Sequence, residues 1–193
     1  MNIPIQIGIT GGIGSGKSIV SRILSIMRYP VYDTDSRAKE LMDTPALRQA
    51  LVEQWGSDII TPGGEINRPL LSSIVFNDPQ QLAHLNNIVH PAVRNHYALW
   101  VQQQQSPIVF VESAILHQAG MDNTLNYIWV VEADRDTRIQ RVMARNNLSR
   151  HDVEARIASQ HLPPIDLRTH IIANNDNDAV LPQIATLLNN ILT

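Results

Sequence analysis

The residues best suited to chemistry form a glycine-rich segment near the start of the chain. This segment, Gly11-Gly12-Ile13-Gly14-Ser15-Gly16-Lys17-Ser18, fits the pattern G-x-x-x-x-G-K-[ST]. Glycines let successive backbone N–H groups point at one anion, and the helix that follows adds the positive end of its dipole. Lys17 is spaced to reach the β- and γ-phosphates of ATP, and the Ser18 hydroxyl to bind Mg²⁺. The pattern therefore predicts phosphate contacts from Gly11, Gly12, Ile13, Gly14, Ser15, Gly16, Lys17 and Ser18.

Two carboxylates end short apolar segments that have the composition of strands. Asp33 ends the segment 29–33, and Glu112 ends the segment 107–112. Ligands of an open α/β sheet bind beyond the carboxyl ends of its strands, so we expect Asp33 to orient or deprotonate an accepting hydroxyl. Asp35 has the alternative role of capping the following helix. Two interpretations of Glu112 stay open, a water-mediated Mg²⁺ ligand and a structural residue.

Three arginines recur at helical spacing later in the chain. Arg138, Arg141 and Arg145 fall on one face of a helix with about 100° per residue. One interpretation is a solvated face whose charges pair with Glu132, Asp134 and Asp136. Beside a phosphate-binding loop, we favour an arginine clamp on the phosphates of ATP, where charge develops during transfer.

The elements that must position these residues alternate along the chain. Apolar segments of strand length cover residues 5–10, 29–33, 107–112, 127–132 and 170–173, and apolar residues recur at helical spacing over 18–27. Strands that are apolar along their whole length and alternate with helices indicate a parallel sheet covered on both faces. We therefore predict an α/β protein of three layers with a five-stranded parallel sheet.

Two segments exceed what such a sheet needs. About seventy residues separate the second and third predicted strands, far more than a crossover helix requires. We interpret residues 36–105 as a helical insertion, with helices over 46–54, 69–75, 80–88 and 91–105. The polar segment 146–164, which ends in Pro163-Pro164, is predicted to be a mobile lid.

Composition limits the class of protein. The chain has 193 residues, 44% of them hydrophobic, and a formal net charge of −3. These values predict one globular domain over residues 1–193, with the insertion and the lid within it, and argue against disorder and against a general nucleic-acid binder. There is no cysteine, which excludes disulfides and thiol catalysis, and no apolar segment of the roughly twenty residues that span a bilayer. We expect a cytoplasmic protein without nucleic-acid or membrane partners.

Other nucleotide-binding classes lack their signatures. A guanine-reading Asn/Thr-Lys-x-Asp motif is excluded because Gly16 precedes Lys17 and Ala38 precedes Lys39. No aspartate is followed three residues later by glycine, and no Leu-Ser-Gly-Gly segment occurs. The glycine spacing also fails the dinucleotide pattern G-x-G-x-x-G. Small-molecule kinases remain, since they need a compact core, an insertion that binds the acceptor, and a lid that excludes water.

The sequence resembles one family of such kinases, the dephospho-coenzyme A kinases, over nearly its whole length. The loop, with Thr10 before it, and the acidic pair Asp33-Thr34-Asp35 are similar to those of the family. The insertion and the arginine-bearing and lid segments are similar through Gly56, Gly64, Arg68, Leu71, Val75-Phe76, Leu85, His90-Pro91, Arg141, Arg145, Leu148-Ser149, Arg156-Ile157 and Gln160.

The resemblance implies ATP-dependent phosphorylation of the ribose 3′-hydroxyl of dephospho-coenzyme A, the last step of coenzyme A synthesis. It implies that Asp33 is the base and that Lys17, with Arg141, is catalytic. ATP and Mg²⁺ would be the cofactors, with Ser18 on the metal. Arg145 and Asn174 would bind nucleotide together with the residues already named.

The resemblance also makes predictions about the acceptor. Arg68 and His90 of the insertion would hold dephospho-coenzyme A, next to Asp33. Arg138 lies outside the matched pattern and is expected to be a surface residue. We expect a monomer or a weak homo-oligomer whose partners are its small-molecule substrates.

The sequence departs from the family near the last predicted strand. Ala173 and Asp176 stand where the family commonly has Asp and Gly, although Asn174 between them is kept. Two other functions stay open from the residues alone: a P-loop kinase of nucleosides, nucleoside monophosphates or a sugar acid, and a nucleotide-sensing protein that uses hydrolysis as a switch.

Overall fold

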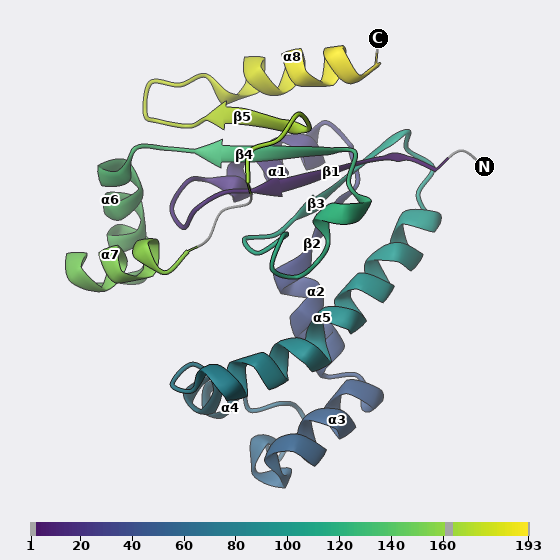
Figure 1. The fold of residues 1–193 in the computed structure, drawn as a ribbon, viewed down its shortest axis with the longest axis vertical. Helices are drawn as coiled ribbons and strands as arrows, with labels where there is room; N and C mark the ends of the chain where they lie inside the picture. Colours follow the sequence, from purple (N-terminus) through teal and green to yellow (C-terminus); the bar gives the residue numbers. More distant parts are fainter. Residues whose placement is uncertain (1–2, 161–163, 193) are drawn as a thin grey trace. The chain divides into compact units, whose positions relative to one another are not determined.

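A computed structural model describes residues 3–160 and 164–192 of the chain. The chain divides into two compact units (Figure 1). The first, called here the sheet unit, consists of Met1–Tyr32 and Gln104–Thr193, and the second, the helical unit, of Asp33–Gln103. Each unit has a hydrophobic core of its own.

Five strands form one sheet, in the order β2-β3-β1-β4-β5. They are β1 (Ile5–Thr10), β2 (Val31–Asp33), β3 (Ile108–Glu112), β4 (Tyr127–Glu132) and β5 (Thr169–Ala173). The pairs β1–β3, β1–β4 and β4–β5 are parallel, and the inner strands β1, β3 and β4 are buried along most of their length. Parallel strands between helices bury both faces, which explains their continuous apolar sequences. The predicted α/β class and five-stranded parallel sheet are confirmed.

Among the described residues, four α-helices belong to the sheet unit. They are α1 (Lys17–Ile26), α6 (Arg135–Asn146), α7 (Arg150–Ala158) and α8 (Val180–Leu192), and a short 3-10 helix, η2 (Asp122–Thr124), lies between β3 and β4. α1 and α8 contact each other, and both contribute to the core that the strands form. α8 is not among the predicted elements, although Val180, Ile184 and Leu188 recur at the spacing of a buried helix face.

The helical unit contains α2 (Thr34–Met42), α3 (Pro45–Trp55), η1 (Ser57–Ile59), α4 (Arg68–Val75) and α5 (Pro79–Gln102). α5 packs against α2, α3 and α4. The hydrophobic core of this unit contains the buried residues Leu51, Ile59, Ile66, Leu71 and Val75.

α5 corrects the prediction of two helices over 80–88 and 91–105. It is one helix of 24 residues that continues through Pro91. A proline inside a helix costs about 3 kcal/mol. The continuous apolar face outweighs this cost, because each buried aliphatic or aromatic side chain contributes roughly 1.5–3 kcal/mol. That face runs on both sides of the proline through Val89, Val93, Tyr97 and Val101.

The segment predicted to be a lid, 146–164, includes α7 and extends over residues 161–163, which lie outside the described residues. Val153 of α7 is buried with Ile139 and Val142 of α6. None of the helices in the described part of the chain is long and apolar enough to cross a membrane.

Candidate functional site

The predicted phosphate loop connects β1, which ends at Thr10, to α1, which begins at Lys17. Gly16 at the start of the helix has φ 96°, a left-handed conformation that side chains disfavour. A Cβ atom there would lie 2.0 Å from Nδ2 of Asn174. The Lys17 ammonium donates to the carbonyl oxygens of Gly11 at 2.7 Å and Gly12 at 3.4 Å. The loop therefore holds its lysine beside the first turn of α1, where backbone N–H groups are left for an anion.

Two hydroxyls of this segment are buried without a hydrogen-bond partner among the described residues. They are Oγ1 of Thr10, whose residue is 0% exposed, and Oγ of Ser15, at 1%. A buried hydroxyl without a partner costs free energy that a bound polar ligand or water recovers. The backbone of Ser15 is fixed at the same time, because the buried Asn174 amide donates to its carbonyl oxygen at 2.7 Å.

The arginines of α6 have different surroundings. Arg141 is half-buried and donates to the carbonyl oxygen of Asn174 at 2.8 Å and to Asp176 at 3.0 Å. Arg145 is exposed and donates to Asn146. Arg141 thus contacts the segment that follows β5. The same segment supplies Asn174, which binds the Ser15 carbonyl oxygen of the phosphate loop. The acidic partner of Arg141 is therefore Asp176, and not one of the three acidic residues considered from the sequence, Glu132, Asp134 and Asp136.

Arg138 corrects the prediction of a surface residue. It is half-buried, and its Nε donates to the carbonyl oxygen of Ile13 in the phosphate loop at 2.9 Å. Burial lowers the pKa of its guanidinium, and the charge of Glu132 partly opposes that effect. The arginine stripe of α6 therefore begins in contact with the loop.

Asp33 is the last residue of β2 and the N-cap of α2. Its Oδ1 accepts hydrogen bonds from the backbone N–H groups of Asp35 at 3.0 Å and Ser36 at 3.3 Å, and its Oδ2 accepts from the Ser36 hydroxyl at 2.6 Å. The cap is thus Asp33 and not Asp35, because the helix begins directly where the strand ends. The carboxylate is exposed and retains lone pairs for an acceptor hydroxyl.

The donors available to a magnesium ion are few. The described residues contain no group of three or more His, Cys, Asp or Glu side chains arranged to hold a metal. The Ser18 residue is exposed in the first turn of α1. Mg²⁺ commonly binds one or two protein oxygens together with substrate phosphates and water, so Ser18 fits this chemistry. Glu112 is the last residue of β3, and both interpretations of it stay open.

In the helical unit, Arg68 begins α4 and forms an ion pair with Asp43, and it also donates to the carbonyl oxygen of Lys39 at 3.0 Å. Asp43 in addition accepts from the backbone N–H of Ile66 at 3.0 Å. The Nε of Arg68 is buried without a hydrogen-bond partner among the described residues. Arg68 therefore links α4 to the end of α2.

His90 lies half-buried on α5, one residue before Pro91. Burial, and secondly the charge of Arg94, lower the pKa of His90 below its usual value. The imidazole is therefore neutral at pH 7, where it can donate one hydrogen bond and accept another.

Comparison with known proteins identifies the family. The sequence model of the dephospho-CoA kinase family matches residues 5–180, which include the whole phosphate loop and every site residue named above. The chain belongs to the dephospho-CoA kinase family. A dephospho-CoA kinase of Porphyromonas gingivalis is 37% identical over 193 residues, which cover 98% of this chain and 95% of the relative.

Two solved structures share the fold of this chain. A crystal structure of a Thermus thermophilus protein is 31% identical, has a TM-score of 0.79, and is aligned over 99% of this chain and 97% of its own. A dephospho-CoA kinase from Campylobacter jejuni shares the fold, with 23% identity, a TM-score of 0.68 and 96% of each chain aligned.

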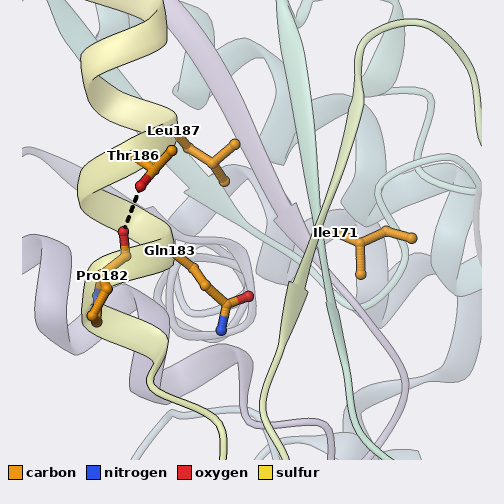
Figure 2. A pocket seen from close by; sticks show the side chains of 5 residues that line it. All are labelled: Ile171, Pro182, Gln183, Thr186 and Leu187. Carbon is orange, nitrogen blue, oxygen red and sulfur yellow. Dashed lines mark hydrogen bonds between the residues drawn. The ribbon is translucent and has the colours of Figure 1, made fainter.

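A separate cavity of about 330 Å³ lies between β5 and α8, and Figure 2 shows the side chains that line it. They are Ile171, Pro182, Gln183, Thr186 and Leu187. Gln183 accepts from the backbone N–H of Ala173 at 2.9 Å and donates to its carbonyl oxygen at 3.0 Å. None of the predicted kinase residues lines this cavity. The side-chain amide of Gln183 is already hydrogen-bonded to the backbone of Ala173, the residue before Asn174.

Two hydrogen bonds of the phosphate loop, with Arg138 and with Gln160, were not predicted from the sequence. Gln160 accepts a hydrogen bond from the Ile13 N–H at 2.6 Å. Gln160 is similar to a residue of the family's lid, but no local pattern pairs it with a loop 147 residues away. The arginine spacing on α6 was a usable signal for Arg138, since it shares a face with Arg141.

Proposed function

We propose that this chain transfers the γ-phosphoryl group of ATP to the ribose 3′-hydroxyl of dephospho-CoA, which yields CoA and ADP. The observation that carries the proposal is the match of the dephospho-CoA kinase family over residues 5–180, together with a phosphate loop of the required geometry within that range. The activity therefore rests on the family, and the residue roles below rest on the chemistry of each side chain.

The phosphate loop, Gly11 to Ser18, is proposed to bind the ATP phosphates through its backbone N–H groups other than that of Ile13, which donates to Gln160. Lys17, which now donates to Gly11 and Gly12, would turn toward the β- and γ-phosphates. The Ser18 hydroxyl would hold Mg²⁺, which when bound neutralises charge on the phosphate oxygens. Electrostatic stabilisation of the transferred phosphoryl group is the main contribution of such a site to catalysis.

Arg141 and Arg145 are proposed to contact the nucleotide phosphates from α6. Arg141 is already near the loop through its bond to the Asn174 carbonyl oxygen, and its pair with the 80% exposed Asp176 is weak because solvent screens it. Arg141 could therefore exchange Asp176 for a phosphate group of the nucleotide at a small cost in free energy. Asn174 would support the site by fixing Ser15 while its segment borders the nucleotide.

Asp33 is proposed to accept the proton of the ribose 3′-hydroxyl while the oxygen of that hydroxyl forms a bond to the γ-phosphorus. The bond from that phosphorus to the β–γ bridging oxygen breaks, and ADP leaves with the electron pair. The support is the place of Asp33 at the carboxyl end of a sheet strand and its fixed carboxylate orientation as the cap of α2. Its remaining lone pairs suit a hydroxyl donor.

The insertion 36–105 is proposed to bind dephospho-CoA, with Arg68 and His90 among its contacts. The guanidinium of Arg68, whose side chain is 39% exposed, is suited to an anionic group of the acceptor, and neutral His90 to an uncharged polar group. The segment 146–164 is proposed to close over ATP and exclude water, which would otherwise accept the phosphoryl group.

We also propose that the enzyme works in the cytoplasm as a monomer or a weak homo-oligomer, without a nucleic-acid partner. The net charge of −3 and the absence of cysteine support this view.

The test is an ATP-consumption assay against a panel of acceptors: dephospho-CoA, nucleosides, nucleoside monophosphates and a sugar acid. We expect turnover with dephospho-CoA and a product phosphorylated at the 3′ position by ³¹P NMR. Turnover with another acceptor alone, or ATP hydrolysis that needs no acceptor, contradicts the proposal.

A further inference from the structure

Ile13 is the residue of the phosphate loop that is most closely attached to the helix pair α6–α7. Its side chain packs against the cluster formed by Ile139, Val142 and Val153. The partly buried residues Met143, Leu148 and Ile157 complete the same cluster. An apolar side chain of the loop is therefore anchored between the two helices.

Both backbone polar groups of Ile13 are also bound by side chains of this region. Its N–H donates to Oε1 of Gln160 at 2.6 Å, and its carbonyl oxygen accepts from Nε of Arg138 at 2.9 Å. Arg138 and Gln160 contact each other too, with 3.4 Å between Nη2 and Oε1. The three residues form a closed hydrogen-bonded group, which we call the Ile13 clasp.

The guanidinium of Arg138 lies directly against the loop. A Cβ atom at Gly12 would be 2.1 Å from its Nη2, so a side chain there would displace the guanidinium. A Cβ atom at Gly14 would be 2.6 Å from the backbone oxygen of Arg138. The sequence of the loop is thus fitted to this arginine as well as to phosphate.

The positive charge of Arg138 has no close acidic counterpart. Within residues 3–160 and 164–192 it forms no ion pair, whereas Arg135 and Arg150 of the same region pair with Glu154. Glu132 acts on it only through its charge. An arginine remains protonated even when partly buried. It therefore adds positive potential beside the loop.

We propose that Arg138 is a positioning residue that, with Gln160, holds the Ile13 peptide and so couples the α6–α7 pair to the phosphate loop. The proposal rests on the proposed function, because its consequence is a loop shaped for ATP before ATP binds. Arg138 does not touch the reacting atoms. It acts through Ile13, and its loss loosens the loop and weakens nucleotide binding without altering the transfer step.

The test compares Arg138→Ala, Arg138→Lys and Gln160→Ala with the wild type, and Arg135→Ala serves as the matched control on the same helix. Its side chain is 65% exposed and pairs only with Glu154 in the described chain. Two quantities are measured: the Kd of Mg-ATP by calorimetry without acceptor, and the amide resonance of Ile13 by NMR without nucleotide. Rates with dephospho-CoA then separate KM from kcat.

Arg138→Ala is expected to raise the Kd and KM of ATP about tenfold and to leave kcat within about twofold. Arg138→Lys keeps the charge but not the planar fork, and is expected to recover part of that loss. Gln160→Ala is expected to shift the Ile13 amide and speed its hydrogen exchange. The double variant is expected to lose less than the sum of the single losses, and Arg135→Ala to match the wild type.

Two results overturn the proposal. One is wild-type ATP affinity in both Arg138 variants, and the other is an unchanged Ile13 amide in Gln160→Ala. If Arg138→Ala does not fold, Arg138→Lys and Gln160→Ala still decide the matter. Failure of the wild type to bind ATP counts against the proposed function instead, because the Ile13 measurement needs no nucleotide.

Discussion

In the sheet unit, two side chains singled out from the sequence hold backbone atoms of the phosphate loop, whereas in the helical unit the predicted acceptor residue Arg68 is engaged in an ion pair. Asn174 fixes the carbonyl oxygen of Ser15, and Arg138 that of Ile13. By contrast, Arg68 pairs with Asp43 inside its own unit. Contacts to the backbone shape a site before its ligand arrives, while a charge pair must be at least partly exchanged for the ligand. We therefore expect a preformed phosphate site, and an acceptor contact at Arg68 that forms only when its ligand binds.

Asp33→Asn tests the proposed chemical role of the first residue of the helical unit and has the largest expected effect. Asparagine caps helices as well as aspartate, so α2 should remain intact. The amide cannot accept the proton of the acceptor hydroxyl, and kcat with dephospho-CoA should fall by about 10²- to 10⁴-fold. Calorimetry should show ATP affinity within about twofold of the wild type. Near-normal turnover would remove Asp33 from the mechanism.

Lys17→Ala tests the phosphate loop, which we expect to be preformed. The ammonium is held at the loop by Gly11 and Gly12, and its loss should weaken ATP binding about ten- to hundredfold. Lys39, the chain's other lysine, is exposed in the helical unit, so Lys39→Ala is the matched control. The KM of ATP under saturating acceptor measures both. Equal behaviour of the two variants contradicts a phosphate role for Lys17.

Arg68→Met tests whether the helical unit binds the acceptor through a residue that also has a structural partner. We expect the KM of dephospho-CoA to rise about tenfold while the KM of ATP stays unchanged. Asp43→Asn breaks the same ion pair but keeps the arginine, which separates binding from stability. If both variants raise the KM of dephospho-CoA equally, Arg68 acts only through the fold of its unit.

Asp176→Asn addresses the weak pair in the sheet unit and has the smallest expected effect. Asp176 stands where the family commonly has glycine, and it occupies one side of Arg141. An exposed pair contributes about 0–1 kcal/mol, so its removal should lower the KM of ATP about two- to threefold. Asp136→Asn, which affects Arg150 instead, is the control. A rise in the KM of ATP would mean that Asp176 helps to position Arg141.

The sheet and the phosphate loop could be predicted because their signals are local. β1 and β4 match the predicted residues, since a buried strand is apolar at every position and the glycines follow it directly. The helical unit was less accessible. Proline at position 91 suggested a helix boundary, but the buried face of α5 was strong enough to continue through it.

The supporting contacts of the site could not be predicted from spacing. Asn174 and Gln160 are 159 and 147 residues away from the loop atoms they bind. Only the packing of β5 beside β4, and of α6 and α7 against the loop, brings them there. That Asp33 and not Asp35 caps α2 could likewise not be predicted, because it depends on a helix that begins with no connecting residue after β2.

The most direct test of the central claim is calorimetric titration of the wild-type protein with ATP in the presence of Mg²⁺ and without acceptor. A loop that is already formed should bind one nucleotide per chain, and prior saturation with dephospho-CoA should not be required. No detectable binding, or binding that appears only after the acceptor is added, would contradict a preformed phosphate site.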